Sequence, residues 1–260
     1  VSILAVTLND ERLVMAHEES VRIAFGELES FASTRVRKQG RQTDRTTGNL
    51  VAARFTHTTS RALDPQLHTH CTVFNATFDE TEKTWKALQA GALYDAIRYG
   101  TEVYRNALAK RIHALGYRTV PAKHGFEIEG VSESVLQRFS KRSAQKNEVI
   151  HEMEQKLGRQ LTNDEIAHAV HHSRDKKLKD ISATEVRERH LAELLPDELT
   201  ALAGLRESAN GQRMKSRSVN ESQSIAHALA HVFERKSVVA EHELLEAALA
   251  HGHGQVELPK

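Results

Sequence analysis

Residues 55–70 read Phe-Thr-His-Thr-Thr-Ser-Arg-Ala-Leu-Asp-Pro-Gln-Leu-His-Thr-His, and they join two runs typical of β-strands, 49–58 and 67–78. The pair Asp64-Pro65 predicts a turn between the runs, which then form an antiparallel hairpin. Side chains alternate between the two faces of a strand, so His68 and His70 share a face. His57 lies opposite either His68 or His70, and both registers put the three imidazoles on the same face.

Three histidines on one face of a hairpin predict a metal site. Imidazole is the commonest metal-binding side chain, and three such ligands leave coordination positions open, as in catalytic sites. Cys71 points to the opposite face, so we do not expect it to be a fourth ligand. The alternative interpretation is a solvated hairpin rich in threonine and histidine. We predict His57, His68 and His70 as the ligands.

The composition narrows the class of protein. Of the 260 residues, 39% are hydrophobic and 27% are charged, as in an ordinary globular protein. The 36 Lys and Arg against 35 Asp and Glu give a formal charge of +1, so a surface that binds nucleic acid must be a local patch. A single cysteine excludes a disulfide scaffold and a Cys-rich zinc module. No apolar run approaches the ~18 residues of a membrane span.

The rest of the chain predicts an α+β fold, an antiparallel sheet with flanking helices and a helical C-terminal tail. The opening run 1–8 resembles a strand, and apolar residues then recur at helical spacing to about residue 36. A second helix is expected from Leu93 to Leu115, with Gly116 as its stop. Short strands are expected at 117–120 and 126–128, followed almost entirely by helices.

Weak apolar periodicity predicts a linker at residues 206–222. The chain is then divided into a body of residues 1–205, this linker, and residues 223–260. The last part contains two short predicted helices, and we interpret it as the start of a following domain.

Two further sets of residues are candidates for the site. A basic, glycine-broken loop precedes the hairpin; it either contacts DNA phosphates or is an ordinary solvated loop. Arg61 and Asp64 are expected to support the histidines by pairing or by capping the turn. The residues predicted to contact DNA are Arg35, Arg37, Lys38, Arg41 and Arg45.

The hairpin resembles the conjugative relaxases of the MobF (TrwC/TraI-like) family. The resemblance rests on Phe55-x-His57-Thr-Thr-Ser-Arg-x-x-Asp64-Pro-x-Leu-His68-Thr-His70. It continues in Gly-Asn-Leu-Val-Ala at 48–52, Gly-Phe-Glu-Ile-Glu-Gly at 125–130 and Phe-Ser-Lys-Arg at 139–142, and covers residues 1 to about 200.

The resemblance implies a fold and an activity. Such enzymes are endonucleases of the His-hydrophobic-His (HUH) type, which nick and rejoin one strand at a plasmid transfer origin through a phosphotyrosyl intermediate. His57, His68 and His70 would hold one divalent metal ion (Mn, Zn, Ni or Mg) over the scissile phosphate. The implied partners are single-stranded transfer-origin DNA, relaxosome proteins and type IV secretion coupling proteins, in the cytoplasm of a bacterium that carries a plasmid or integrative element.

One departure from the family limits this expectation. The family's nucleophilic tyrosines precede the strand that resembles Val1–Ile3, so we expect the nucleophile upstream of Val1 and no catalytic tyrosine in this chain. The tyrosines present are interpreted as core or interface aromatics. We therefore expect the chain alone to bind metal but not to cleave efficiently.

Two other functions stay open at this point. The chain could be a non-catalytic remnant that binds single-stranded DNA. It could instead be a three-histidine metallohydrolase that uses metal-bound water, which requires a carboxylate base near the hairpin, and Asp64 is the close candidate.

Overall fold

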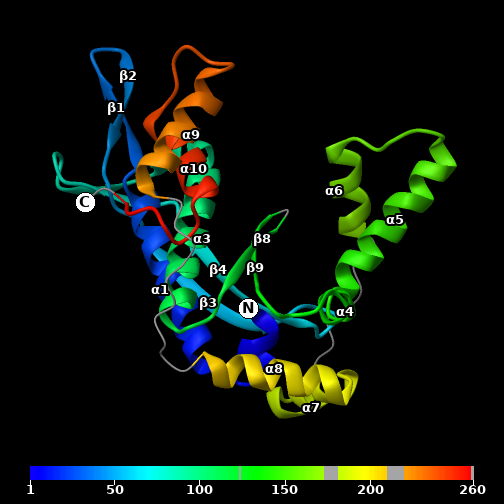
Figure 1. The fold of residues 1–260 in the computed structure, drawn as a ribbon. Coiled ribbons are helices and arrows are strands. Elements are labelled where there is room, and N and C mark those ends of the chain that lie inside the picture. Colours follow the sequence, from blue (N-terminus) through cyan, green and yellow to red (C-terminus); the bar gives the residue numbers. More distant parts are fainter. Residues whose placement is uncertain (123, 173–180, 210–219, 259–260) are drawn as a thin grey trace. The chain divides into compact units, whose positions relative to one another are not determined.

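The computed structural model describes residues 1–122, 124–172, 181–209 and 220–258. Its contacts divide the chain into two compact units (Figure 1). The core unit comprises residues 11–56, 69–129 and 208–260, and the lobe unit comprises residues 1–10, 57–68 and 130–207. Helices are interspersed with small antiparallel sheets, which confirms the α+β prediction.

The core unit is built around two long helices, α1 (Glu11–Glu29) and α3 (Ile97–Ala114), which pack side by side (Figure 1). The buried face of α1 carries residues three or four apart, as helical packing requires. Gly100 allows the close approach, because a methyl group there would lie 3.0 Å from Leu28 of α1. The buried residues of α1 are Leu13, Ala16, His17, Ser20 and Ala24.

The last two helices belong to the same unit. Helix α10 (Glu241–His251) packs against α3 and against α9 (Glu221–Phe233). Leu249 of α10 joins Tyr99 and Val103 of α3 in one hydrophobic cluster. The predicted domain boundaries stay a prediction, but residues 221–258 share a hydrophobic core with α1 and α3.

Three small antiparallel sheets lie wholly in the core unit. Strand β1 is the middle strand of a three-stranded sheet, and its long partner is β2, which follows it in a hairpin. The short helix α2 (Gly91–Asp95) leads into α3. The sheets are β2 (Arg41–Thr46), β1 (Ser33–Lys38) and β7 (Leu88–Gln89); β5 (Thr77–Asp79) and β6 (Thr84–Lys86); and β8 (Thr119–Ala122) and β9 (Gly125–Ile128).

The lobe unit is almost entirely helical. The side chains of Ser132 and Ser182 cap α4 and α7, as is typical of serine at a helix N-terminus. Arg187 of α7 donates a hydrogen bond to the carbonyl of Thr7, which ties the first residues of the chain to this unit. Its helices are a π-helix (Ile3–Thr7), α4 (Glu133–Arg138), α5 (Lys141–Leu157), α6 (Asn163–His172), α7 (Ala183–Glu193) and α8 (Pro196–Ser208).

Three predictions about elements are wrong. The opening residues form a π-helix instead of a strand; a short apolar run that is buried on all sides does not distinguish the two by periodicity. Helix α1 ends at Glu29, and the expected basic loop is the β1–β2 hairpin. The predicted helix 93–115 is two helices separated at Ala96. Most of the predicted linker, residues 210–219, lies outside the described residues.

Candidate functional site

Strands β3 (Ala52–Thr59) and β4 (Pro65–Val73) form the predicted hairpin. The backbone N–H of Phe74 donates to the carbonyl of Val51 at 2.8 Å, and the hydroxyls of Thr56 and Thr69 are 3.0 Å apart. In this antiparallel register His57 lies opposite His68, and their rings stack with centroids 5.5 Å apart and an interplanar angle of 29°. The structure therefore chooses one of the two registers that the sequence left open.

The tautomer of His68 is set by its own strand. Its Nδ1 is 2.8 Å from the carbonyl oxygen of Gln66, which only accepts hydrogen bonds. Nδ1 therefore carries the proton, and Nε2 carries the lone pair that a metal ion needs. His57 is exposed and His68 is half-buried.

His70 lies two residues further along β4, and its side chain is exposed. Among the described residues, the structure contains no group of three His, Cys, Asp or Glu side chains arranged to hold a metal ion. The structure thus brings together His57 and His68, and the assignment of all three histidines as ligands stays a prediction. Burial raises the pKa of the Cys71 thiol, which disfavours the thiolate that a metal would bind.

The turn of the hairpin is built around Asp64, which is 3% exposed. The backbone N–H of Ser60 donates to the Asp64 carbonyl at 2.9 Å, and the N–H of Asp64 donates to Ser60 Oγ at 3.1 Å. Asp64 Oδ2 accepts the backbone N–H of Lys141 at the start of α5 (3.0 Å), and Oδ1 is 3.5 Å from Lys141 Nζ. The backbone of Asp64 thus closes the turn, and its carboxylate pairs with Lys141. Arg61 is exposed, and the supporting role of Arg61 and Asp64 for the histidines stays a prediction.

Asp64 is a poor general base in this setting. Burial raises the pKa of its carboxyl group, and the nearby Lys141 opposes that shift. Both of its oxygens are directed at Lys141. The side chain supports the turn and does not present an accessible carboxylate to the histidines.

Two buried histidines that the sequence did not single out also contact the hairpin. In the lobe unit, His190 is 2% exposed and its Nε2 donates to the carbonyl of Leu63 in the turn. In the core unit, His17 is 3% exposed and its Nε2 is 2.8 Å from Thr69 Oγ1. The helical position of His17 among apolar residues of α1 indicates burial, but no local pattern indicates its partner.

The basic residues lie on the β1–β2 hairpin, where Lys38 and Arg41 flank the tip and face each other. Arg37, Lys38 and Arg41 are exposed, and Arg35 Nη2 donates to Gln89 Oε1 at 3.1 Å. Arg45 differs from the others. Its Nη1 lies 2.7 Å from the buried carboxylate of Asp79, and hydrogen bonds from Lys86 and then Arg45 hold the pKa of that carboxyl far below its usual range. Arg45 is therefore part of a charge cluster around the buried Asp79.

The comparisons with known proteins agree with one another. A family model described as TrwC relaxase matches residues 1–195, three quarters of the chain. The chain belongs to the TrwC relaxase family. The multifunctional conjugation protein TraI of Escherichia coli is 40% identical over 164 residues, and the same protein of strain K12 is 39% identical over 164 residues. These matches cover 58% of the chain and 9% of TraI.

Solved structures of the conjugative relaxase TrwC have the same fold. A copper-bound complex with oriT DNA is 31% identical, with a TM-score of 0.68, and the match covers 74% of this chain and 65% of that one. A metal-free complex gives the same TM-score over 67% of its chain. A complex with a 27-mer that contains the recognition hairpin and the cleavage site is 32% identical, with a TM-score of 0.67. The chain spans about two thirds of these TrwC chains.

In this relaxase-family chain three of the four tyrosines, Tyr99, Tyr104 and Tyr117, are placed in ways that oppose nucleophilic attack. Tyr99 is 3% exposed and its hydroxyl donates to Glu27 Oε2 at 2.8 Å, and burial with this contact raises its pKa well above 10. Burial also raises the pKa of Tyr104 to about 12. Tyr117 is 3% exposed, which confirms the core interpretation for it. Tyr94 is 72% exposed, so it is not a core residue, and its interpretation as an interface aromatic stays a prediction.

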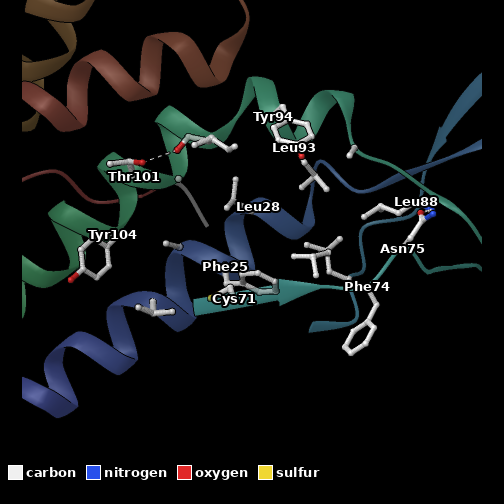
Figure 2. Close-up of a pocket in the computed structure, with 17 residues that line it drawn as sticks. Phe25, Leu28, Cys71, Phe74, Asn75, Leu88, Leu93, Tyr94, Thr101 and Tyr104 are labelled. Atoms are coloured by element: carbon white, nitrogen blue, oxygen red, sulfur yellow. Dashed lines mark hydrogen bonds between the residues drawn. The ribbon is translucent and has the colours of Figure 1, made fainter. Parts of the chain in front are cut away.

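Tyr94 and Tyr104 line an apolar cavity of about 830 Å³ within the core unit. Figure 2 shows Phe25 and Leu28 of α1, Cys71 of β4 and Leu93 around it. The lining carries no Lys, Arg or His that would attract a phosphate. This cavity is therefore not the candidate nuclease site.

Three further histidines, on α9 and α10, form a separate group in the core unit. His227 and His231 stack with centroids 6.0 Å apart, and His227 stacks on His251 at 4.0 Å. Burial and the neighbouring His227 lower the pKa of His251.

No helix among the described residues is long and apolar enough to cross a membrane.

Proposed function

We propose that this chain is the metal-binding part of a DNA relaxase that nicks and rejoins one strand at a transfer origin through a phosphotyrosyl intermediate, in conjugative DNA transfer. Membership of the TrwC relaxase family over residues 1–195 supports this activity class. The names of the relatives, a conjugation protein and a relaxase bound to oriT DNA, support the process and the substrate.

The observation that carries the proposal is the pairing of His57 with His68 across the hairpin. The two imidazoles lie 5.5 Å apart on neighbouring strands, and the lone pair of His68 is on Nε2. Strand alternation directs His70 to the same side as His68. Stacked rings do not point their nitrogens at one position, so we expect the rings to turn when an ion binds.

Three imidazoles fit a divalent transition metal, and one ion of Mn, Zn, Ni or Mg is proposed; nitrogen ligands favour the first three over Mg. When bound, the ion would stabilise negative charge on the non-bridging oxygens of the scissile phosphate. The chain's own residues do the rest of the positioning. Asp64 and Lys141 hold the turn, and the exposed cations Arg37, Lys38 and Arg41 are proposed to hold the DNA backbone.

Residues 1–260 are proposed to bind metal and DNA without efficient cleavage. Attack on phosphorus needs a tyrosine oxygen that is accessible and readily deprotonated. Tyr99 and Tyr117 are buried, and the raised pKa of Tyr104 disfavours its phenolate. Tyr94 is exposed but lines the apolar cavity, where phosphate is not attracted.

A three-histidine metallohydrolase is disfavoured by the placement of Asp64, which is buried and held by Lys141. The proposed partners are single-stranded origin DNA, relaxosome proteins and a secretion coupling protein, met in the cytoplasm. The alternative that the chain is a non-catalytic remnant that binds single-stranded DNA is examined by the test below.

The test uses labelled single-stranded oligonucleotides from the oriT sites of the TraI and TrwC relatives, and the same sequences as duplexes. We expect preferential binding of the single strands and no covalent adduct on a denaturing gel. A covalent adduct would contradict the assignment of the four tyrosines. Equal affinity for duplex and single strand would overturn the relaxase proposal. The non-catalytic remnant would be favoured if the chain binds no metal and if His57→Ala and His68→Ala leave its single-strand binding unchanged.

A further inference from the structure

His17 on α1 connects three elements of the core unit through its two ring nitrogens. Nδ1 is 2.8 Å from the Tyr104 hydroxyl on α3, and Nε2 is 2.8 Å from Thr69 Oγ1 on β4. The side chain is 3% exposed, so water does not compete for these contacts. Both nitrogens are therefore used to join helix to helix and helix to strand.

Thr69 is the residue between His68 and His70. Its side chain lies on the opposite face of β4 from the two imidazoles, because side chains alternate along a strand. Its hydroxyl is also 3.0 Å from Thr56 Oγ1 on β3. A series of hydrogen-bonded side chains thus contacts both strands of the hairpin on the face opposite the imidazoles: Tyr104, His17, Thr69 and Thr56.

The hydrogen-bonded series ends at Tyr104, which is packed against His17. The rings of His17 and Tyr104 meet edge to face, with centroids 5.6 Å apart and an interplanar angle of 81°. Tyr104 lies at the end of the apolar cavity with its hydroxyl turned away from the other labelled residues (Figure 2). Burial keeps this hydroxyl protonated, and α1 and α3 are packed along their length.

We propose that His17 is a positioning residue for the histidine site: it fixes strand β4 at Thr69 and thereby aims the imidazoles of His68 and His70. The inference rests on the proposed metal site. Metal ligands have to be held within about 0.5 Å of their working positions, and contacts behind the ligands supply that precision. A strand anchored at the residue between two ligands cannot shift or twist without breaking the contact to the buried imidazole.

The test compares variants that break and retain the contact between residue 17 and Thr69. Thr69→Val keeps the branched shape and removes the hydroxyl. His17→Asn keeps an amide near the Nδ1 position, whereas His17→Gln reaches the Nε2 position and is the rescue variant. Ser20→Ala is the matched control, because Ser20 is a buried polar residue on the same helix whose hydroxyl donates to Ala16.

The probe is Co²⁺, followed by titration calorimetry and by its visible absorption bands, with the signal of His68→Ala/His70→Ala subtracted. We expect Thr69→Val and His17→Asn to weaken binding about tenfold and to alter the bands, and His17→Gln and Ser20→Ala to bind like the wild type. Backbone amide exchange from residue 68 to 71 should accelerate in the first two variants only.

The outcomes separate the two proposals. A wild-type chain that binds no Co²⁺ above the subtracted signal overturns the metal site and with it the role of His17. If the wild type binds, but Thr69→Val and His17→Asn keep its affinity and bands, the His17 proposal alone is wrong. The His17 proposal is also wrong if these two variants lower the melting temperature but leave Co²⁺ binding unchanged, because that is the result expected when His17 only stabilises the fold.

Discussion

The histidine hairpin β3–β4 (52–73) and the basic hairpin β1–β2 (33–46) are supported in different ways. The turn of β3–β4 encloses the buried carboxylate of Asp64, and buried histidines contact the hairpin at Leu63 and Thr69. The β1–β2 hairpin ends in an exposed Gln39-Gly40 turn. Metal ligands require fixed positions, whereas long cationic side chains reach phosphates from a simple scaffold. The support of each hairpin therefore matches the chemistry proposed for it.

The turns show the same contrast in their backbone. Gln39 and Gly40 have φ of 49° and 75°, as expected for a two-residue hairpin turn. Leu63 has φ of 64°, which is strained for a branched side chain. Contacts from Ser60 and His190 hold Leu63 in that conformation. The turn of the histidine hairpin thus depends on tertiary contacts, whereas the tip of the basic hairpin is formed by its own two turn residues; tertiary contacts to that hairpin are made away from the tip, through β7 and Asp79.

The largest effect is expected from neutralising the exposed cations of the basic hairpin. Arg37→Gln/Lys38→Gln/Arg41→Gln should weaken single-strand binding at least tenfold and flatten its log–log salt dependence by about 2, since each phosphate contact contributes about 0.7. Fluorescence anisotropy over a salt series measures both. The charge-matched control is Lys146→Gln/Lys156→Gln/Arg189→Gln, and an unchanged slope in the first variant would refute the assignment.

A smaller effect is expected from removing the carboxylate beneath the histidine turn. Asp64→Ala leaves the buried N–H of Lys141 without its acceptor and should lower the free energy of unfolding by about 1.5 kcal/mol. Urea denaturation followed by circular dichroism measures this loss. Asp44→Ala, an exposed carboxylate on β2, should be neutral. Equal effects of the two substitutions would mean that the two hairpins are not supported differently.

Arg45 should behave as a residue of the fold and not of the DNA surface. Arg45→Gln removes one of the cations paired with the buried Asp79, so we expect the melting temperature to fall by roughly 2–4 °C. Single-strand affinity should change less than twofold. If Arg45→Gln instead weakens single-strand binding and flattens its salt dependence, with no change in melting temperature, then Arg45 contacts DNA.

The effect that is confined to alkaline pH concerns Tyr104, the support of His17. Its pKa is raised to about 12 in the folded chain, against about 10 when unfolded, so the unfolded chain ionises first as the pH rises. The stability that this group contributes is full below pH 10 and is lost towards pH 12. Tyr104→Phe should remove that part of the decline in a series of unfolding curves between pH 9 and 12. A decline of the same size in the variant would contradict the assignment.

Local patterns were sufficient to predict the hairpin and the shared face of His57 and His68. Alternation along a strand acts over a few residues, and the structure confirms the pairing of β3 with β4 and the facing rings of His57 and His68. The turn lies at Arg61 and Ala62, just before Asp64, and Pro65 is the first residue of β4. The basic segment was misjudged because its strands are polar on both faces near the tip. In β1 only Ser33, Thr34 and Val36 are buried, and this pattern is too short and irregular to indicate a strand.

Contacts between distant residues could not be predicted in this way. His17 and Thr69 are 52 positions apart, and Asp64 and Lys141 are 77 positions apart. Nothing in the neighbourhood of His17 distinguishes a histidine that supports the site from one that only fills the core. The same limit applies to Arg45, whose basic neighbours indicate a DNA contact, while its partner Asp79 lies 34 positions further along the chain, on β5.

The most direct test of the account is the metal content of the purified chain, measured by mass spectrometry after incubation with Mn, Zn and Ni and removal of unbound ions. We expect about one divalent ion per wild-type chain, none in His68→Ala/His70→Ala, and one in the control His227→Ala/His231→Ala. A wild-type chain without metal, or a double variant that keeps its ion, would contradict the claim that the histidine hairpin is the metal site.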